Sequence, residues 1–430
     1  MRYRQVPLYA LLIAGSLASS FAAERPEVTR PRATSGDSAV EPDWEERMTV
    51  TVGLSGADIN GAGHEAIQAA VDYVAGYGGG TVRVMPGTYR LRNAVHLRSG
   101  VRLLGEGDKT VLIKEPSATT TLAEDSDWYD QEVTLSDPAG FKVGDGICLR
   151  SKDAKTGRQT VLKRTLIARS GSRFKLDKAL RENLWQMNGA TAATLFPILT
   201  GEFIEDITIE NLTLDGNRDH NENLDGNYAG CIFLQDCSRV AIRGVTAQNF
   251  NGDGISWQIC HDVLVENCVS RNHQGLGLHP GSGSQRPIIR NNTLAGNDIG
   301  LFFCWGVKYG LAEGNTIEGN RVGISIGHRD TDNLITGNTI ADSRAQGLLF
   351  RPERGPSFAG HRNRIEGNVL RDNGPEDGAA IEIQGGTESI RIAGNEIVET
   401  RGSAKREAVR QGPETKDIVL EGNRVSGFEK

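Results

Sequence analysis

The chain has 430 residues, enough for a large hydrophobic core, and a formal net charge of −7 at pH 7. Because general nucleic-acid-binding proteins are usually basic, this charge argues against nucleic acid as a partner. The 53 glycines and the aromatic content of only 6% favour a turn-rich β protein over a helical one.

The first residues have the pattern of an export signal. Arg2 and Arg4 precede an apolar run at 6–18, which is too short to span a bilayer, and small residues follow it. We therefore predict a signal peptide at 1–23 and a secreted or periplasmic protein. The polar segment 24–50 contains three prolines and predicts a flexible linker. No later stretch of the sequence predicts a membrane helix.

A short helix is predicted after the linker. Apolar residues recur on one helical face between His64 and Ala75, and the glycines at 78–80 end the pattern. The segment 81–89 then alternates apolar and other residues with a period of two, which predicts strands.

The region 230–384 repeats one short phrase, in which two apolar residues flank a variable one. The first apolar residues of these phrases are Ile232, Ile255, Leu278, Leu301, Ile324, Leu348 and Ile381. The first four intervals are 23 residues, the fifth is 24 and the last is 33, which indicates a loop insertion. Such a period predicts a solenoid, because one unit cannot bury its apolar face without its neighbours.

A second phrase, Asn-x-apolar, accompanies the first. It begins at Asn267, Asn292, Asn315, Asn338, Asn368, Asn395 and Asn423. Each period thus holds two or three short strands separated by Gly and Asn, which tolerate left-handed backbone angles at corners. This pattern predicts an all-β parallel β-helix in which the Asn side chains form an internal ladder between coils.

Two sequences, GGGTVRVMPGTYRL (78–91) and LRSGVRLLGEGDKTVL (97–112), resemble the N-terminal cap and first coils of the pectate-lyase-like superfamily. The resemblance implies a right-handed parallel β-helix with coils of about 23 residues, whose N-terminal helix covers the open strand edges. It places the cap and first coils at 51–123 and further coils at 201–430. Residues 124–200 break the repeat and predict an inserted small β module. The superfamily includes polysaccharide lyases, polygalacturonase-like hydrolases, mannuronan epimerases and phage tailspikes.

One face of the predicted coils carries most of the candidate functional residues. If the flanking apolar residues point into the core, the residue between them points outward. These outward positions hold Phe233, Ser256, His279, Phe302, Ser325, Leu349 and Glu382. Just beyond the strands lie Gln235, Gln258, Trp305, His328, Arg329, Asp330, Arg351, Glu353 and Gln384. Because aromatic rings stack on sugars and exposed apolar patches mark binding surfaces, this face is either a glycan groove or a solvated polar face.

We assign predicted substrate contacts in this groove to Gln235, Gln258, Phe302, Trp305, Glu353, Glu382 and Gln384. A uronic-acid lyase or epimerase also needs a base for the C5 proton and a cation beside the carboxylate. His279 and His328 are candidate bases, since imidazole titrates near neutral pH. The candidate cations are Arg329, Arg351 and Lys308. A hydrolase would instead use two carboxyl groups, for which the candidates are Asp253, Asp330, Glu353 and Glu382.

The resemblance leaves the reaction open. The segment 251–254, NGDG, lies where polygalacturonase-like enzymes carry an acidic pair, but it holds a single Asp. The phrase GLGLHPG around His279 is similar to their Gly-His-Gly motif without matching it. Mannuronan epimerases have an Asp-Pro-His-acid tetrad where this chain has SWQI at 256–259.

Two further patterns concern a metal and the thiols. Oxygen ligands alternate in the segment LDGNRDHNENLDG at Asp215, Asn217, Asp219 and Asp225. This alternation suits Ca²⁺, although a solvated loop can have the same composition. Cys237 and Cys260 are one period apart, so we expect them in adjacent coils, either bridged or stacked as buried thiols.

These patterns together predict an exported monomer that binds an acidic polysaccharide and cleaves it by β-elimination, with Ca²⁺ as a candidate cofactor. Hydrolysis, uronate epimerisation and a non-catalytic glycan-binding solenoid are the alternatives. We expect no nucleic-acid partner and no insertion into a membrane.

Overall fold

The computed structural model describes residues 46–352, 355, 357–402 and 405–428. The predicted signal peptide and most of the predicted linker lie outside these residues. The first strand begins at Thr49, so the last two residues of the predicted linker already pair with the coils. The chain divides after Arg47, and the description below concerns the unit that begins at Met48.

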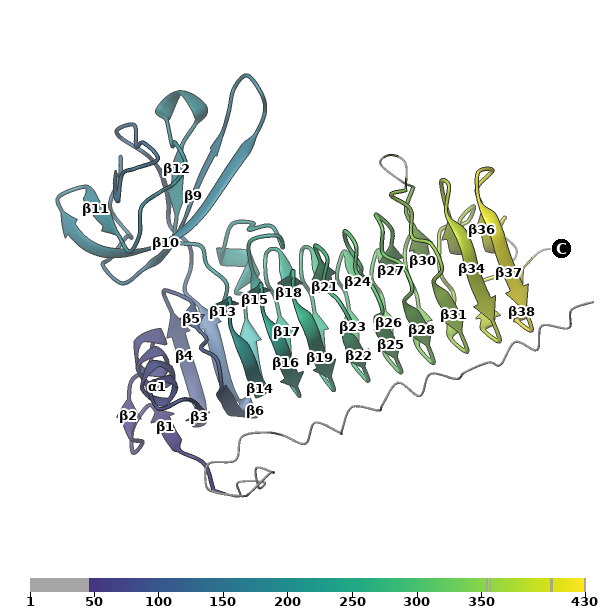
Figure 1. The fold of residues 1–430 in the computed structure, drawn as a ribbon, viewed down its shortest axis with the longest axis horizontal. Coiled ribbons are helices and arrows are strands. Elements are labelled where there is room, and N and C mark those ends of the chain that lie inside the picture. The colour runs from purple at the N-terminus through teal and green to yellow at the C-terminus, as the bar shows by residue number, and fades with distance from the viewer. Residues whose placement is uncertain (1–45, 353–354, 356, 403–404, 429–430) are drawn as a thin grey trace, which may run out of the picture. The chain divides into compact units, whose positions relative to one another are not determined.

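Successive coils stack their strands into three parallel ladders (Figure 1). The ten-stranded sheet consists of β5 (Val95–His96), β13 (Leu199–Glu202), β15 (Gly230–Gln235), β18 (Asp253–Gln258), β21 (Leu276–Gly281), β24 (Ile299–Phe302), β27 (Val322–Ile326), β30 (Gln346–Phe350), β33 (Ala379–Ile383) and β36 (Glu407–Gln411).

The other two ladders share the long strands β6 and β14 and therefore form one 22-stranded sheet. The second ladder contains β1 (Thr49–Gly53), β2 (Ile59–Asn60), β3 (Gly80–Val84), β6 (Val101–Lys114), β14 (Glu205–Asp215), β16 (Ser238–Arg243), β19 (His261–Glu266), β22 (Ile288–Arg290), β25 (Leu311–Glu313), β28 (Leu334–Thr336), β31 (Arg364–Glu366), β34 (Glu388–Ala393) and β37 (Lys416–Glu421). The third contains β4 (Gly87–Leu91), β17 (Thr246–Gln248), β20 (Val269–Arg271), β23 (Thr293–Ala295), β26 (Thr316–Glu318), β29 (Thr339–Ala341), β32 (Val369–Arg371), β35 (Glu396–Val398) and β38 (Arg424–Ser426).

The period read from the sequence is the register of the ten-stranded sheet. Ile232 pairs with Ile255, Ile255 with Leu278 and Leu278 with Leu301. The same pairing continues across the intervals of 24 and 33 residues. These residues are fully buried between the sheets, so each coil buries its apolar side chains against the coils above and below. The predicted parallel β-helix is confirmed.

The predicted helix is also confirmed. Helix α1 (His64–Gly76) buries the predicted apolar face, which consists of Ala66, Ile67, Ala70, Val71 and Val74. It packs against the first strands, chiefly β3, β1 and β5. Because a solenoid end would otherwise expose its core and strand edges, this helix closes the N-terminal end of the hydrophobic core.

The inserted segment forms a separate six-stranded sheet (Figure 1). Its strands are β7 (Thr119–Thr121), β8 (Glu132–Thr134), β9 (Gly146–Lys152), β10 (Gln159–Ser170), β11 (Arg173–Leu176) and β12 (Thr191–Ala193), with a short 3₁₀ helix η1 (Gln186–Asn188). The sheet has its own apolar cluster, which includes Phe141, Phe174 and Leu184. It begins before residue 124 because β7 pairs with β12, and the chain rejoins the coils at β13.

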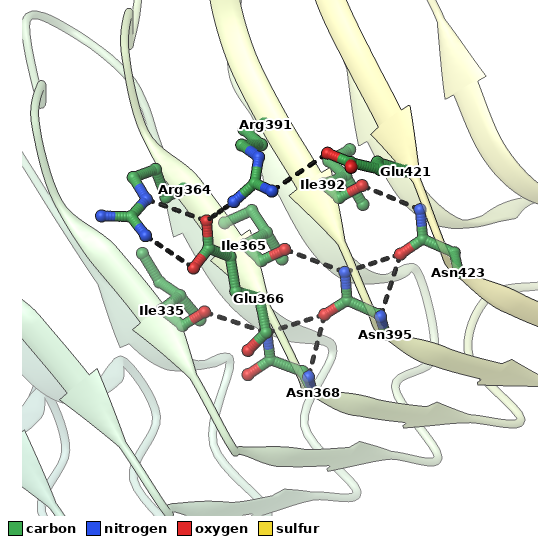
Figure 2. A network of polar contacts seen from close by, with 10 residues as sticks. All are labelled: Ile335, Arg364, Ile365, Glu366, Asn368, Arg391, Ile392, Asn395, Glu421 and Asn423. Atoms are coloured by element: carbon green, nitrogen blue, oxygen red, sulfur yellow. Dashed lines mark hydrogen bonds and ion pairs between the residues drawn. The ribbon is translucent and has the colours of Figure 1, made fainter.

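The Asn ladder lies at the corner between the second and third ladders, inside the coils (Figure 2). Asn368 Nδ2 donates to Asn395 Oδ1 at 3.0 Å, and Asn395 Nδ2 donates to Asn423 Oδ1 at 2.9 Å. Each amide also donates to a main-chain carbonyl of the preceding coil, as Asn395 does to Ile365. Asn267 does not belong to the ladder. Cys268 occupies the equivalent place, and its N–H donates to Asn292 Oδ1 at 2.9 Å.

The cysteines are reduced and buried. All six are present as thiols, and the Cys237 N–H lies 3.4 Å from Cys260 Sγ in the next coil. The alternative of stacked thiols, rather than a bridge, therefore describes this pair.

Lys114, at the end of β6, has an amine that is fully buried between the coils and the module. Its Nζ donates to the Phe196 carbonyl at 2.8 Å and lies 4.5 Å and 5.0 Å from the ring centroids of Phe196 and Phe250. Burial lowers the pKa of this amine from 10.5 to about 7. Between pH 7 and 10.5 the unfolded chain therefore binds a proton that the folded chain does not bind, and stability rises with pH through this window.

This linkage predicts a pH-dependent effect of Lys114→Met. Relative to the variant, the wild-type protein should gain about 3 kcal/mol between pH 7 and pH 9.5, since one pKa unit corresponds to about 1.4 kcal/mol. Thermal unfolding of both proteins at the two pH values measures the change. Lys109→Met, in an exposed part of the same strand, is the control and should not change the pH dependence. Parallel curves for wild type and Lys114→Met would contradict a neutral buried amine.

Candidate functional site

The outward positions of the ten-stranded sheet form one continuous row. The register places in line Thr200, Phe233, Ser256, His279, Phe302, Ser325, Leu349 and Glu382. Much of this row is covered, contrary to the expectation of an open polar face. Phe233, Ser256 and Ser325 are fully buried, and they contact Lys163 of the module, the Gly226 carbonyl and Arg351 respectively.

A cavity of about 640 Å³ opens over β18, β21 and β24. Its lining includes Asp225, Asn227, Asp253, His279, Ser282, Phe302, Trp305 and His328. Six of these residues are predicted site residues: Asp225 is a predicted Ca²⁺ ligand, and Asp253, His279, Phe302, Trp305 and His328, from four different coils, are predicted catalytic or substrate-binding residues. Parallel stacking brings them together because their positions repeat with the period of the coils.

Asp253 and His279 form a buried pair at the floor of this cavity. His279 Nδ1–H donates to Asp253 Oδ2 at 2.8 Å, and both side chains are only 4% exposed. The other carboxylate oxygen accepts the Leu276 N–H at 2.9 Å, which fixes the orientation of Asp253. A carboxylate on Nδ1 holds the imidazole tautomer whose Nε2 carries a lone pair. That Nε2 is buried and has no hydrogen-bond partner among the described residues.

Ser256 does not complete a nucleophilic triad with this pair. Its hydroxyl donates to the Gly226 carbonyl at 2.6 Å and accepts from Gln258 Nε2 at 3.1 Å. It lies 3.4 Å from Nδ1, the same nitrogen that contacts Asp253, so His279 cannot use opposite nitrogens for the two partners. Gln258, predicted to contact substrate, is buried and instead holds Ser256.

The loop from Asn221 to Ala229 covers one side of the pair. A Cβ at Gly226 would lie 1.6 Å from Asp253 Oδ2, so only glycine lets the loop come this close. Glu222 anchors the loop to the module through an ion pair with Arg150 at 2.7 Å. The insertion therefore positions a wall of the cavity.

Aromatic side chains also line the cavity. The Phe302 ring lies edge-on to His279 with 5.3 Å between centroids, and Trp305 is 44% exposed beside His328. Trp305 and His328 have φ values of 66° and 53° at equivalent corners of successive coils. The equivalent corner residues Asp236, Ile259 and Ser282 of the preceding coils are left-handed too, so these angles belong to the turn of the coil.

Arg351 and Asp330 form a second buried pair behind Phe302. The Arg351 guanidinium lies 4.2 Å from the Phe302 ring centroid, donates to Ser325 Oγ at 2.7 Å and is 3.3 Å from Asp330 Oδ2. Burial raises the pKa of Asp330 to about 7, against the opposing effects of Arg351 and of main-chain N–H donors. Asp330 is inaccessible, so its geometry does not fit the predicted role of a hydrolytic carboxyl group.

The remaining predicted residues are spread along the solenoid. Arg329 stacks on Phe358 at 3.9 Å, and Phe358 contacts Trp305. The main chain of Lys308 forms parallel β-bridges with Gln285 and Thr331 in the neighbouring coils. Lys308 does not line the cavity. The Gln235 side chain donates a hydrogen bond to its neighbour Asp236. Glu382 lies four strands beyond His279, and its carboxylate accepts hydrogen bonds from Gln384 and Gln346. Glu353 lies outside the described residues.

The predicted Ca²⁺ ligands are largely engaged with the protein itself. Asp215 accepts from Asn217, Gln248 and Asn249, and Asp225 Oδ1 accepts from Asn227. Asp219 lies in η2 (Arg218–His220) and is exposed. Among the described residues, no group of three or more His, Cys, Asp or Glu side chains is arranged to hold a metal ion. The Ca²⁺ site stays a prediction.

Asn227, Ser282 and Phe358 are among the residues of this region that were not identified from the sequence. Ser282 could have been found, since it lies one period before Trp305 at the same corner. Asn227 and Phe358 belong to segments that interrupt the repeat, where no period indicates a position.

Comparison with known proteins identifies the hand of the solenoid. The family described as "Right handed beta helix region" matches residues 230–397. The chain is a right-handed parallel β-helix. No curated protein sequence matches it. Helix α1, like every other helical segment among the described residues, is too short or too polar to cross a membrane.

Solved structures share the fold of this β-helix over most of its length. The A-module of the mannuronan C-5 epimerase AlgE6 from Azotobacter vinelandii has a TM-score of 0.53 at 15% identity, covering 85% of this chain and 94% of that chain. The AlgE4 A-module from the same organism gives 0.51 at 16%, covering 84% and 93%. A structure described as a glycoside hydrolase gives 0.50 at 12%, covering 87% and 96%. These similarities establish the fold.

Proposed function

We propose that this β-helix is an exported, monomeric enzyme that cleaves an acidic polysaccharide by β-elimination, with His279 as the base. The observation that carries the proposal is the unpartnered Nε2 of His279, a residue that Asp253 orients and that lines a cavity together with Phe302 and Trp305. A ring-oriented imidazole suits proton abstraction, and aromatic side chains suit a sugar ring.

In the proposed reaction, His279 Nε2 takes the proton from C5 of a uronate. The electron pair of that C–H bond forms the C4–C5 double bond, and the bond from C4 to the glycosidic oxygen breaks. The departing oxygen needs a proton, and His328, which lines the same cavity, is the candidate donor. Negative charge developing on the uronate carboxylate needs a cation, for which Arg351, Arg329 and Ca²⁺ are the candidates.

Hydrolysis has less support. Two carboxyl groups about 5–9.5 Å apart would have to flank the bond. Both oxygens of Asp253 are engaged, Asp330 is fully buried, and Glu382 is about 19 Å from His279 by the strand spacing.

Epimerisation at C5 is the second candidate. It uses the same base, and two mannuronan C-5 epimerase modules share the fold of this chain. The two reactions diverge after proton abstraction, when a proton returns to the opposite face of C5 and the glycosidic bond stays intact.

One assay separates these reactions. The mature protein is incubated with alginate, pectin, glucuronan and glycosaminoglycans in D₂O, with Ca²⁺ or with a chelator. Elimination should raise the absorbance at about 235 nm, whereas epimerisation should incorporate deuterium at C5 without that absorbance. New reducing ends with neither signal would identify a hydrolase. A protein that binds one of these polymers and gives no product would be a non-catalytic solenoid.

A further inference from the structure

A second cavity, of about 380 Å³, lies where the inserted module meets the first coils. We name it the junction cavity, and its lining includes Arg98, Lys163, Arg164, Asp177, Lys178, Thr200, Glu202 and Phe203. Its volume is within the range of small-ligand sites, roughly 300–1,000 Å³. We infer that the junction cavity is a separate binding site for a carboxylated sugar. This inference goes beyond the proposed function, since it concerns a site that does not contain His279.

Two buried polar atoms of this cavity have no partner in the protein. Thr200 is 6% exposed, and the register with His96 and Phe233 places its side chain on the outer side of the sheet, toward the cavity. Its Oγ1 makes no hydrogen bond. Arg164 directs its terminal nitrogens to the carbonyls of Lys163, Ala179 and Leu180, while its Nε is buried without a partner. Both residues line the cavity, and each of the two groups is a donor that an oxyanion could satisfy.

The charge of the cavity favours an anion. Its described lining contains four Arg or Lys side chains and two carboxylates. Lys163 Nζ lies 3.9 Å from the Phe233 ring centroid and 4.0 Å from Glu202 Oε1, and burial lowers the pKa of this amine to about 8. Asp177 accepts the Thr165 N–H, and Arg98 pairs with Asp72. The amine of Lys163 has lost hydrating water through burial. The carboxylate of an incoming ligand would stabilise the charge of this amine in place of that water.

Phe203 indicates that the anion belongs to a sugar. This side chain is 77% exposed at the cavity and has a φ of 55°. The register of the sheet places it at the coil corner that Trp305 occupies in the site of His279. An exposed aromatic ring beside an oxyanion pocket offers a stacking face for the ring of a uronate, which inorganic phosphate or sulfate would not use.

The junction cavity is separate from the cavity of His279. Three strand spacings, about 14 Å, lie between Thr200 and His279. The two intervening outward residues, Phe233 and Ser256, are fully buried, beneath Lys163 and against the Gly226 carbonyl respectively. A glycan cannot follow the sheet directly from one cavity to the other, so the junction cavity would anchor a separate part of the polymer or a second chain.

The test measures binding of sodium glucuronate and sodium galacturonate by saturation-transfer NMR, with glucose and galactose as neutral counterparts. Lys163→Met and Thr200→Val should weaken uronate binding, the former about tenfold or more because a charge-assisted contact is lost. Phe203→Ala should weaken it as well. His279→Ala should leave this binding intact, so the result does not depend on whether the enzyme assay succeeds. Lys155→Met, an exposed lysine of the module outside this cavity, is the matched control.

The inference is overturned if wild-type protein binds no uronate, or if Lys163→Met and Thr200→Val bind it as the wild type does. Equal binding of glucose would exclude recognition of the carboxylate. If sodium sulfate displaces glucuronate at equal concentration and Phe203→Ala has no effect, the cavity is a general oxyanion site and the assignment to a sugar fails. Thermal unfolding of each variant verifies that weaker binding is not a loss of fold.

Discussion

Replacement of His279 by Ala should lower kcat on the polymer that responds in the proposed assay by about 10³-fold, while substrate affinity changes little. Its imidazole lines the cavity over β18, β21 and β24 and is hydrogen-bonded to the Asp253 carboxylate through Nδ1. Its other nitrogen, Nε2, is buried and has no partner among the described residues. Added imidazole should restore part of the rate, because it can enter the space left by the side chain and accept the proton. Steady-state rates on the polymer that responds in the assay measure both effects.

Asp253→Asn should also lower kcat, by roughly 10²–10⁴-fold. The amide introduced by this substitution would donate to Nδ1 of His279 and shift the imidazole proton to Nε2, which removes the lone pair from the cavity. His220→Ala is the control, since His220 is an exposed residue of η2.

Full activity of His279→Ala would exclude His279 as the base. A loss of substrate affinity equal to the loss of rate would assign it to binding.

The second large effect concerns stability. Asn338→Ala should lower the free energy of unfolding by about 3 kcal/mol or more. Asn338 is fully buried, its Oδ1 accepts from the main chain and the side chain of Asn315, and its Nδ2 donates to the Ala312 carbonyl and to Asn368 Oδ1. Alanine leaves these buried groups without partners in a space that was filled by the amide. Urea and thermal unfolding followed by circular dichroism measure the loss.

Asn423→Ala provides the matched control for the ladder. Asn423 makes the same kinds of contacts with Asn395 and Ile392, but it is partly exposed in the last coil, where water can replace the lost bonds (Figure 2). Its replacement should cost less than half as much as that of Asn338. Equal costs at both positions would contradict the argument that burial of unsatisfied groups, rather than the amide contact alone, determines the effect.

The repeat in the sequence was enough to predict the solenoid, the inward residues and the line of outward residues. Ile232, Ile255 and Leu278 lie one period apart, and parallel stacking turns equal spacing in the chain into contact in space. The capping helix followed from the same kind of local pattern, since its apolar face repeats every three to four residues. One Asn of the ladder, Asn267, was misplaced because the phrase around it is shifted by one residue from the ladder position at Cys268.

The repeat does not indicate which outward residues are accessible, because this depends on contacts between segments far apart in the sequence. The alternating pattern predicts an outward position for Ser256 and positions just beyond a strand for Gln258 and Asp330. All three residues are nevertheless buried. Asp330 is enclosed by a corner of the coils, where it accepts main-chain N–H groups of Gly306 and Gly327 and contacts Arg351. The loop with Gly226, whose carbonyl accepts from Ser256, breaks the period, so no repeat predicts where it folds back. The pairing of Asp253 with His279 depends on that loop, because exclusion of water and the close approach of Gly226 bring the two side chains into one buried site.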